Sequence, residues 1–174
     1  MTEARASGDH RMTPDAEEPP MRAPAPLDRL DLPPVWGALF WAAIWLWSVT
    51  MPSWAPVPDV LRPVGYAVAA GGIGFALWAL QQFRGRDTPV EPKREPRALV
   101  TTGPYRLTRN PMYRGLVWVT IGYVLIRGEF TALLLAALYA WVLNRRFIVP
   151  EERALEAAFG ADFRDWAERV RARL

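Results

Sequence analysis

The stretch that decides the fold is residues 97–152, which read RALVTTGPYRLTRNPMYRGLVWVTIGYVLIRGEFTALLLAALYAWVLNRRFIVPEE. It starts as a basic, proline-punctuated loop, continues as two apolar runs and ends on the acidic pair Glu151 and Glu152. The Gly128-Glu129 step between the apolar runs is typical of a tight turn, so the runs predict an antiparallel helical hairpin. Charge held against lipid is costly and is kept mainly where it has a function. We therefore expect the arginines and glutamates that bracket this hairpin to form a site.

Four apolar segments in all predict an all-α, polytopic membrane helical bundle with four transmembrane helices. They are Leu32–Pro58 (helical over Val35–Met51), Pro63–Phe83, Gly115–Ile126 and Phe130–Asn144. The second segment has 21 uncharged residues, enough for the ~20 that span a bilayer core. The third is short, but Arg114 and Arg127 at its ends can reach the two interfaces and lengthen it. In the alternative, the last two segments are buried helices of a soluble bundle, but the first two segments span without help.

Composition agrees with a membrane protein and narrows its chemistry. Hydrophobic residues make up 51% of the 174 and include nine tryptophans, which is too apolar for an ordinary soluble domain. The absence of cysteine excludes disulfides and thiolate chemistry, and the single histidine, His10, lies in a polar tail, so we expect no metal. The basic residues show no nucleic-acid-binding signature, so the expected partner is a lipid bilayer and not a nucleic acid.

Charge placement predicts the domain organisation and the topology. Residues 1–31 combine prolines with mixed charges, lack periodicity and lack the apolar core of a signal peptide. We expect a disordered cytoplasmic tail there, followed by one membrane domain over residues 32–174. Of the 21 lysines and arginines, only Arg62 and Arg127 fall in the loops after the first and third segments. The positive-inside rule then places both termini and the 84–114 loop in the cytoplasm.

The second segment also carries small residues at four-residue spacing, which lets helix backbones approach closely. These residues are Gly65, Ala69, Ala70, Gly71, Gly72 and Gly74. Helix packing is the favoured interpretation, and close contact with a ligand is the alternative.

The middle loop ends in a helix start that suits an anion. Asn110 is a preferred N-cap residue, and Pro111 is tolerated at the first helical position. The helix N-terminus offers unpaired amide donors, and Arg106 and Arg109 add two cations. This pattern indicates an anion-binding pocket at the cytoplasmic interface. The alternative is a capped helix whose two arginines face lipid headgroups.

The C-terminal region predicts an amphipathic helix-turn-helix that folds back along the membrane surface. Residues 144–146 close the fourth segment, Pro150 starts a new helix, and Gly160 ends that helix before a second one. Glu151 and Glu152 occupy the first turn, where carboxylates favour the helix dipole. They are either ordinary first-turn residues or ligands of a hydroxyl or ammonium group, on a molecule whose other end the arginines hold.

Two strings in this region, LVTTGPYRLTRNPMYRG and VPEERALEAAFGADF, with a hydrophobic hairpin between them, resemble the membrane methyltransferase superfamily. That group includes the isoprenylcysteine carboxyl methyltransferases and the phospholipid N-methyltransferases. The resemblance covers residues 88–170. It implies an enzyme that enfolds S-adenosylmethionine at the cytoplasmic face of a helical bundle and takes a lipophilic small-molecule or lipid substrate from the bilayer.

The resemblance also implies site residues. The cofactor contacts would fall on Arg97, Ala98, Leu99, Val100, Gly103, Tyr105, Asn110, Pro111, Met112, Tyr113 and Glu151. On charge grounds we add Arg106, Arg109 and Glu152. The expected catalytic residues are Asn110, Glu151 and Glu152.

Two positions depart from the eukaryotic prenylcysteine enzymes. Asn110 stands where those enzymes have a histidine before the proline, and asparagine cannot accept a proton near neutral pH. Phe147 stands where they have the arginine that holds the substrate's carboxylate. Arg145 and Arg146 lie close by and are therefore the candidates for binding substrate. The acceptor stays open between a carboxylate, an amine and a thiol.

Methyl transfer from a sulfonium needs alignment and exclusion of water rather than a metal or a covalent intermediate. A carboxylate acceptor needs no base, whereas an amine or thiol must lose a proton, for which Glu151 or Glu152 is the nearby candidate. Two other functions stay open. One is a sterol-reductase-like, NADPH-dependent membrane oxidoreductase, although those proteins are much longer. The other is a non-catalytic membrane scaffold that retains the fold.

Overall fold

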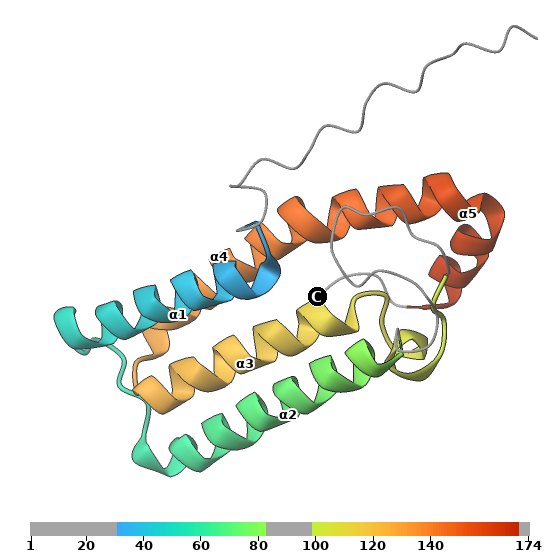
Figure 1. Ribbon diagram of the computed structural model, residues 1–174. Helices are drawn as coiled ribbons and strands as arrows, with labels where there is room; N and C mark the ends of the chain where they lie inside the picture. The colour runs from blue at the N-terminus through green and yellow to red at the C-terminus, as the bar shows by residue number, and fades with distance from the viewer. Residues whose placement is uncertain (1–30, 83–98, 171–174) are drawn as a thin grey trace, which may run out of the picture.

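The computed structural model describes residues 31–82 and 99–170, and its regular structure there is helical (Figure 1). The long helices are α1 (Pro33–Thr50), α2 (Arg62–Gln81), α3 (Pro111–Arg127), α4 (Leu133–Leu143) and α5 (Val149–Arg169), with 3₁₀ turns at Asp59–Leu61, Gly103–Arg106 and Phe130–Ala132. The all-α prediction is confirmed for these residues. Nearly all of the predicted tail lies outside the described residues.

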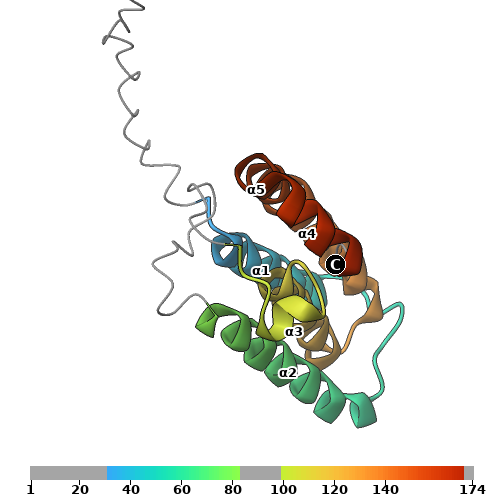
Figure 2. The ribbon, with the colours of Figure 1, turned by 90° about the vertical axis from the view of Figure 1, so that its right-hand side faces the viewer.

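The central helix of the bundle is α3. It packs against α1, α2 and α4, and an end-on view places it between α1 and α2 (Figure 2). Helices α1, α2 and α3 each carry a proline in the first turn, where the missing N–H costs no hydrogen bond and the fixed φ suits the helix. These three helices therefore begin within a turn of the positions that the sequence predicts.

Within residues 31–82 and 99–170, two helices are long and apolar enough to cross a membrane. One is Asp59–Gln81, which contains α2, and the other is the continuous helix Phe130–Arg169, which contains α4 and α5. In the second helix the charged residues, which begin with Arg145 and Arg146, all follow the apolar α4. Spanning by α1 and α3, and the cytoplasmic position of the termini, stay predictions.

The α3–α4 hairpin turns at Gly128 and Glu129, as predicted. Gly128 adopts φ 85°, a left-handed conformation that glycine tolerates, and its N–H donates to Val124 O. Glu129 is only 5% exposed, and its carboxylate accepts hydrogen bonds from Ser53 Oγ, Ala55 N, Thr131 N and Thr131 Oγ1. This carboxylate ties the α1–α2 connection to the hairpin, at the end of the bundle where α3 finishes.

We expect Glu129→Ala to lower thermal stability more than Ser53→Ala or Thr131→Ala, because Glu129 is the common acceptor of these hydrogen bonds. Burial by itself raises the pKa of Glu129, but hydrogen bonds from Thr131, Ser53 and Ala55 outweigh it and hold that pKa below its usual value. A lowered folded-state pKa contributes stability that is present above the unfolded-state pKa and is lost as pH falls through the folded-state value. Thermal unfolding in detergent, from neutral to acidic pH, measures both effects. An acid profile that is the same in Glu129→Gln would contradict this role.

Glycines bring α2 and α3 into close contact. A Cβ added at Gly72 would lie 2.6 Å from Gly115 O, and one added at Gly122 would lie 2.6 Å from Gly65 O. By contrast, a Cβ added at Gly71 would meet no described atom within 4 Å. The packing interpretation is therefore confirmed for Gly65 and Gly72, whereas Gly71 faces away from α3.

A π-helical turn, Asn144–Ile148, joins α4 to α5 without a break. The N–H of Val149 donates to Asn144 O, five residues back, and Ile148 keeps helical dihedral angles (φ −64°, ψ −51°). As predicted, α4 ends just before residues 144–146 and α5 starts with Pro150 in its first turn, but the π-helical turn leaves no break between the two helices. The wider turn shifts the hydrogen-bond register just before Pro150, which has no N–H to donate, and so the helix continues through the proline.

Helix α5 turns back on itself at Gly160, which confirms the predicted helix-turn-helix (Figure 1). Gly160 has φ 52° and ψ −114°, a conformation that residues with a Cβ rarely adopt. The returning half packs against the end of α2 and the loop before α3, and its position along a membrane surface stays a prediction. We call the buried group that forms there the C-terminal cluster: Ala79, Val100, Tyr105, Phe163, Trp166, Ala167 and Val170.

Candidate functional site

The start of α3 and the start of α5 meet through two side-chain hydrogen bonds. Asn110 Nδ2 donates to Glu152 Oε1 at 3.0 Å, and Tyr113 Oη donates to Glu151 Oε2 at 2.8 Å. Asn110 and Tyr113 lie one turn apart at the start of α3, and the two glutamates are adjacent on α5. The structure therefore brings together the three residues that we expect to be catalytic, Asn110, Glu151 and Glu152.

Asn110 occupies the predicted N-cap position of α3, but its side chain does not cap the helix. It is 6% exposed, and its amide nitrogen reaches across to Glu152. The next residue, Pro111, has no N–H that needs a cap, and the backbone O of Asn110 already accepts the N–H of Arg114. The Asn110 side chain is thus available to orient a carboxylate on another helix.

Glu151 lies in an environment that disfavours its charge. Burial raises the pKa of Glu151, the hydrogen bond from Tyr113 opposes the rise, and the neighbouring charge of Glu152 adds to it. Tyr113 is itself fixed, because it is almost fully buried and its ring stacks on Phe147 at a centroid distance of 6.3 Å. A carboxyl with a perturbed pKa and a fixed partner is typical of a functional site.

The two arginines predicted to bind an anion, Arg106 and Arg109, lie in different surroundings. Arg109 Nε donates to Val170 O at 3.1 Å and Arg109 Nη2 donates to Ala167 O, which ties the loop before α3 to the end of α5. These two bonds leave other guanidinium N–H groups able to donate to a ligand. Arg106 is exposed, and within the described part of the chain no hydrogen bond or ion pair joins it to either glutamate.

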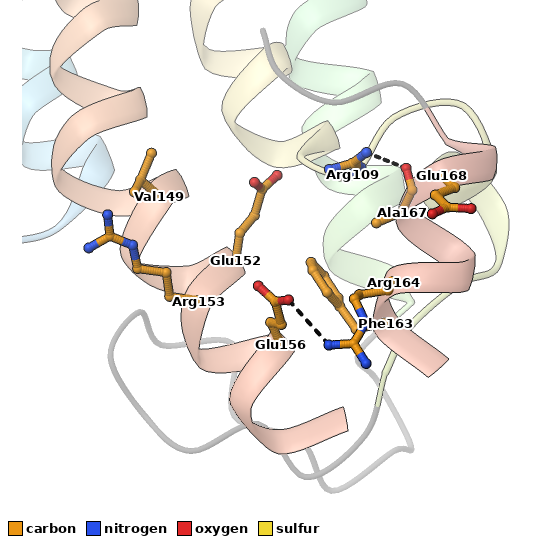
Figure 3. Close-up of a pocket in the computed structure, with 9 residues that line it drawn as sticks. All are labelled: Arg109, Val149, Glu152, Arg153, Glu156, Phe163, Arg164, Ala167 and Glu168. Atoms are coloured by element: carbon orange, nitrogen blue, oxygen red, sulfur yellow. Dashed lines mark hydrogen bonds and ion pairs between the residues drawn. The ribbon is translucent and has the colours of Figure 1, made fainter. Parts of the chain in front are cut away.

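A cavity of about 400 Å³ opens between the two halves of α5 and Arg109 (Figure 3). This volume is in the range of small-molecule sites. Glu152 lines the cavity, and an ion pair between Glu156 Oε1 and Arg164 Nη1, at 3.7 Å, joins the two halves of α5. The other lining residues are Val149, Arg153, Phe163, Ala167 and Glu168. The walls thus combine charges of both signs with an apolar part, which suits a zwitterion that carries an apolar group.

Four of the other residues that the resemblance assigns to the cofactor lie in or against the C-terminal cluster, which shares Phe163 and Ala167 with the cavity. Leu99, Val100, Tyr105 and Met112 belong to the C-terminal cluster or pack against it. Gly103 has φ 60°, and Pro111 is buried at the first position of α3. Arg97 and Ala98 lie outside the described residues. The predicted set therefore divides into a polar part at the glutamates and an apolar part in the cluster.

Arg145 and Arg146, the predicted substrate ligands, lie in the π-helical turn and are exposed. Arg146 Nε pairs with Asp31 Oδ1 at 2.6 Å, and its guanidinium lies over the Trp36 ring at 5.4 Å. Neither arginine lines the cavity of Figure 3. Arg146 instead fastens the start of α1 to the π-helical turn, and a substrate role for the two arginines stays a prediction.

Sequence reasoning did not predict that the returning half of α5 lines the cavity of the candidate site. Phe163 and Ala167 line the cavity, and Trp166, which lies between them in the sequence, belongs to the C-terminal cluster. The available signal was the apolar face formed by Phe163, Trp166 and Val170, but such a face by itself predicts only an amphipathic helix. Its place in the site depends on the sharp turn at Gly160.

The chain matches one family model, described as phospholipid methyltransferase, over residues 61–162. The matched range covers more than half of the chain, from the start of α2 to the returning half of α5, and includes Asn110, Tyr113 and both glutamates. No curated protein and no solved structure matches the chain.

Proposed function

The chain belongs to the phospholipid methyltransferase family of S-adenosylmethionine-dependent membrane enzymes, and we propose that it methylates the amine of a phospholipid headgroup. The observation that carries the proposal is the pair Glu151 and Glu152, which lies inside the matched range and is held by Tyr113 and Asn110. An amine is the nucleophile that common phospholipid headgroups offer, and its ammonium form is attracted by adjacent carboxylates. The match to the phospholipid branch favours this acceptor over a prenylcysteine carboxylate.

The residues at the cavity suit S-adenosylmethionine. Glu152 and Arg109 supply the opposite charges that an amino-acid zwitterion requires, and Phe163 and Ala167 supply an apolar wall. The adjoining cluster also contains the buried Nε1 of Trp166, which has no hydrogen-bond partner among the described residues. When bound, the cofactor supplies a methyl group on a sulfonium, which is already activated for transfer.

The protein must remove a proton from the acceptor's ammonium group, because only the neutral amine is nucleophilic. We assign its removal to Glu151, since burial raises the pKa of Glu151 and makes it a stronger base than an exposed glutamate. Tyr113 holds one oxygen of Glu151, and Asn110 holds one oxygen of Glu152. Each carboxylate is thus oriented in advance and keeps its second oxygen for a ligand.

The same proposal includes the location of the reaction. Residues 32–174 form the catalytic domain, and the site lies at the cytoplasmic face, with both termini and the 84–114 loop on that side. The clustering of lysine and arginine outside the loops that carry Arg62 and Arg127 supports this orientation.

Reconstitution of the purified chain in vesicles tests the acceptor. Phosphatidylglycerol vesicles receive either phosphatidylethanolamine or phosphatidylcholine, together with S-adenosylmethionine that carries a labelled methyl group. We expect labelled lipid only with phosphatidylethanolamine, because the quaternary nitrogen of phosphatidylcholine has no lone pair. If mild base releases the label, the label was carried as a methyl ester, and the amine acceptor would be excluded. The amine acceptor would also be excluded if phosphatidylethanolamine stays unlabelled in a preparation that still binds the cofactor.

A further inference from the structure

Trp166 carries a buried donor for which the described part of the chain provides no acceptor. The residue is 5% exposed, and its Nε1 has no hydrogen-bond partner among the described residues. Native proteins pair the great majority of their buried polar groups, and an unpaired one costs free energy. Trp166 does not line the cavity, but its neighbours Phe163 and Ala167 do, so the orphan donor beside the cavity is explained if a ligand supplies its acceptor.

Among residues 31–82 and 99–170, the surroundings of Trp166 offer few acceptors. Its ring lies 5.7 Å from that of Phe163, and the rest of the C-terminal cluster is apolar apart from the Tyr105 hydroxyl. The nearby backbone carbonyls of Ala167 and Val170 already accept hydrogen bonds from Arg109. The pocket of Figure 3 reaches this cluster, because Phe163 and Ala167 belong to both.

We propose that Trp166 Nε1 donates a hydrogen bond to a ring nitrogen of the cofactor's adenine and so fixes the nucleobase in the C-terminal cluster. The inference rests on the use of S-adenosylmethionine and extends it to a residue that sequence reasoning did not assign. A flat aromatic base suits an apolar, aromatic surrounding that offers a single donor. The charged end of the cofactor then falls to Glu152 and Arg109 at the cavity wall.

Calorimetric titration in detergent with S-adenosylhomocysteine tests this assignment. The ligand is compared with three analogues, in which N1, N3 or N7 of the adenine is replaced by carbon, on wild-type protein and on Trp166→Phe. We expect the wild type to lose about tenfold in affinity for one analogue, the one without the acceptor nitrogen. Trp166→Phe should lose about tenfold for S-adenosylhomocysteine itself and should no longer distinguish it from that analogue.

The control is Trp141→Phe, which changes an exposed tryptophan on α4 and should bind all four ligands like the wild type. Thermal unfolding without ligand separates binding from packing. Because the N–H has no partner in the part of the chain that the structure describes, Trp166→Phe removes no hydrogen bond there, and any loss of stability reflects packing. Equal discrimination among the ligands by Trp166→Phe and wild type would overturn the proposal. Absence of S-adenosylhomocysteine binding by the wild type would instead count against the proposed function.

Discussion

Glu151→Gln is expected to lower kcat/KM for methyl transfer by about 10²–10⁴-fold, the range for loss of a general acid–base group. Glutamine has the same size and can still accept the hydrogen bond from Tyr113 Oη. The variant therefore removes the charge and the basicity while leaving the contact between α3 and α5 in place. Initial rates with vesicles that contain phosphatidylethanolamine measure the effect.

The unliganded Glu151→Gln protein should become more stable relative to wild type as pH rises. A carboxyl with a raised folded-state pKa contributes stability that is present below the unfolded-state pKa and is lost as pH rises through the folded-state pKa. Glutamine has no such loss, so the variant should gain about 1 kcal/mol above that pKa, the usual scale for relieving a destabilised site. Thermal unfolding in detergent across neutral pH measures this gain.

The affinity for the cofactor is the third property that tests the role of Glu151. Wild-type affinity for S-adenosylmethionine should fall as pH drops through the raised pKa of Glu151. The Glu151 carboxylate then becomes neutral and no longer attracts the positively charged cofactor. In Glu151→Gln the affinity should be lower and nearly independent of pH in that range.

The matched control is Asp162→Asn, which removes an exposed carboxylate from the same helix and should behave like wild type in all three measurements. Activity of Glu151→Gln within about threefold of wild type would contradict the proposed base. In that case Glu152, or the acceptor's own chemistry, would have to account for proton loss.

The sequence predicts the helices of this fold well because local chemistry decides them. Prolines mark the starts of α1, α2 and α3, and the Gly128-Glu129 step and Gly160 mark turns that the structure confirms. The sequence does not predict that the chain stays helical up to Pro150, and this continuity has a specific cause. A proline inside a helical pattern usually signals a break, but a π-helical turn, which depends on packing of Leu143, Phe147 and Ile148 in the core, absorbs it.

The candidate site is less accessible to sequence reasoning, because its contacts cross between elements. The charges of Glu151 and Glu152 are visible in the sequence, but their partners are separated from them by the whole hairpin. Arg106 and Arg109 look equivalent in the sequence. They differ in the structure because only Arg109 meets the carbonyls at the end of α5. Phe163 and Ala167 reach the cavity only through the turn at Gly160, whose direction no local pattern specifies.

Gly72→Ala is the second change for which we expect a large effect, a loss of about 1–3 kcal/mol of stability from overpacking. The new Cβ would lie 2.6 Å from Gly115 O and 2.9 Å from Val119 N, and these are backbone atoms that cannot rotate away. The two helices must therefore separate. Because the end of α2 supplies Ala79 to the C-terminal cluster and α3 carries Asn110, separation should also weaken cofactor binding.

Gly71→Ala is the control one residue away on the same helix. Its Cβ would meet no described atom within 4 Å, and alanine is a better helix former than glycine, so this variant should gain about 0.5–1 kcal/mol. Gly72→Ala combined with Gly115→Ala should cost less than the sum of the single changes, because the same pair of backbones separates once. Thermal unfolding in detergent measures each variant. Equal shifts for Gly71→Ala and Gly72→Ala would show that α2 and α3 do not approach as closely as their glycines allow.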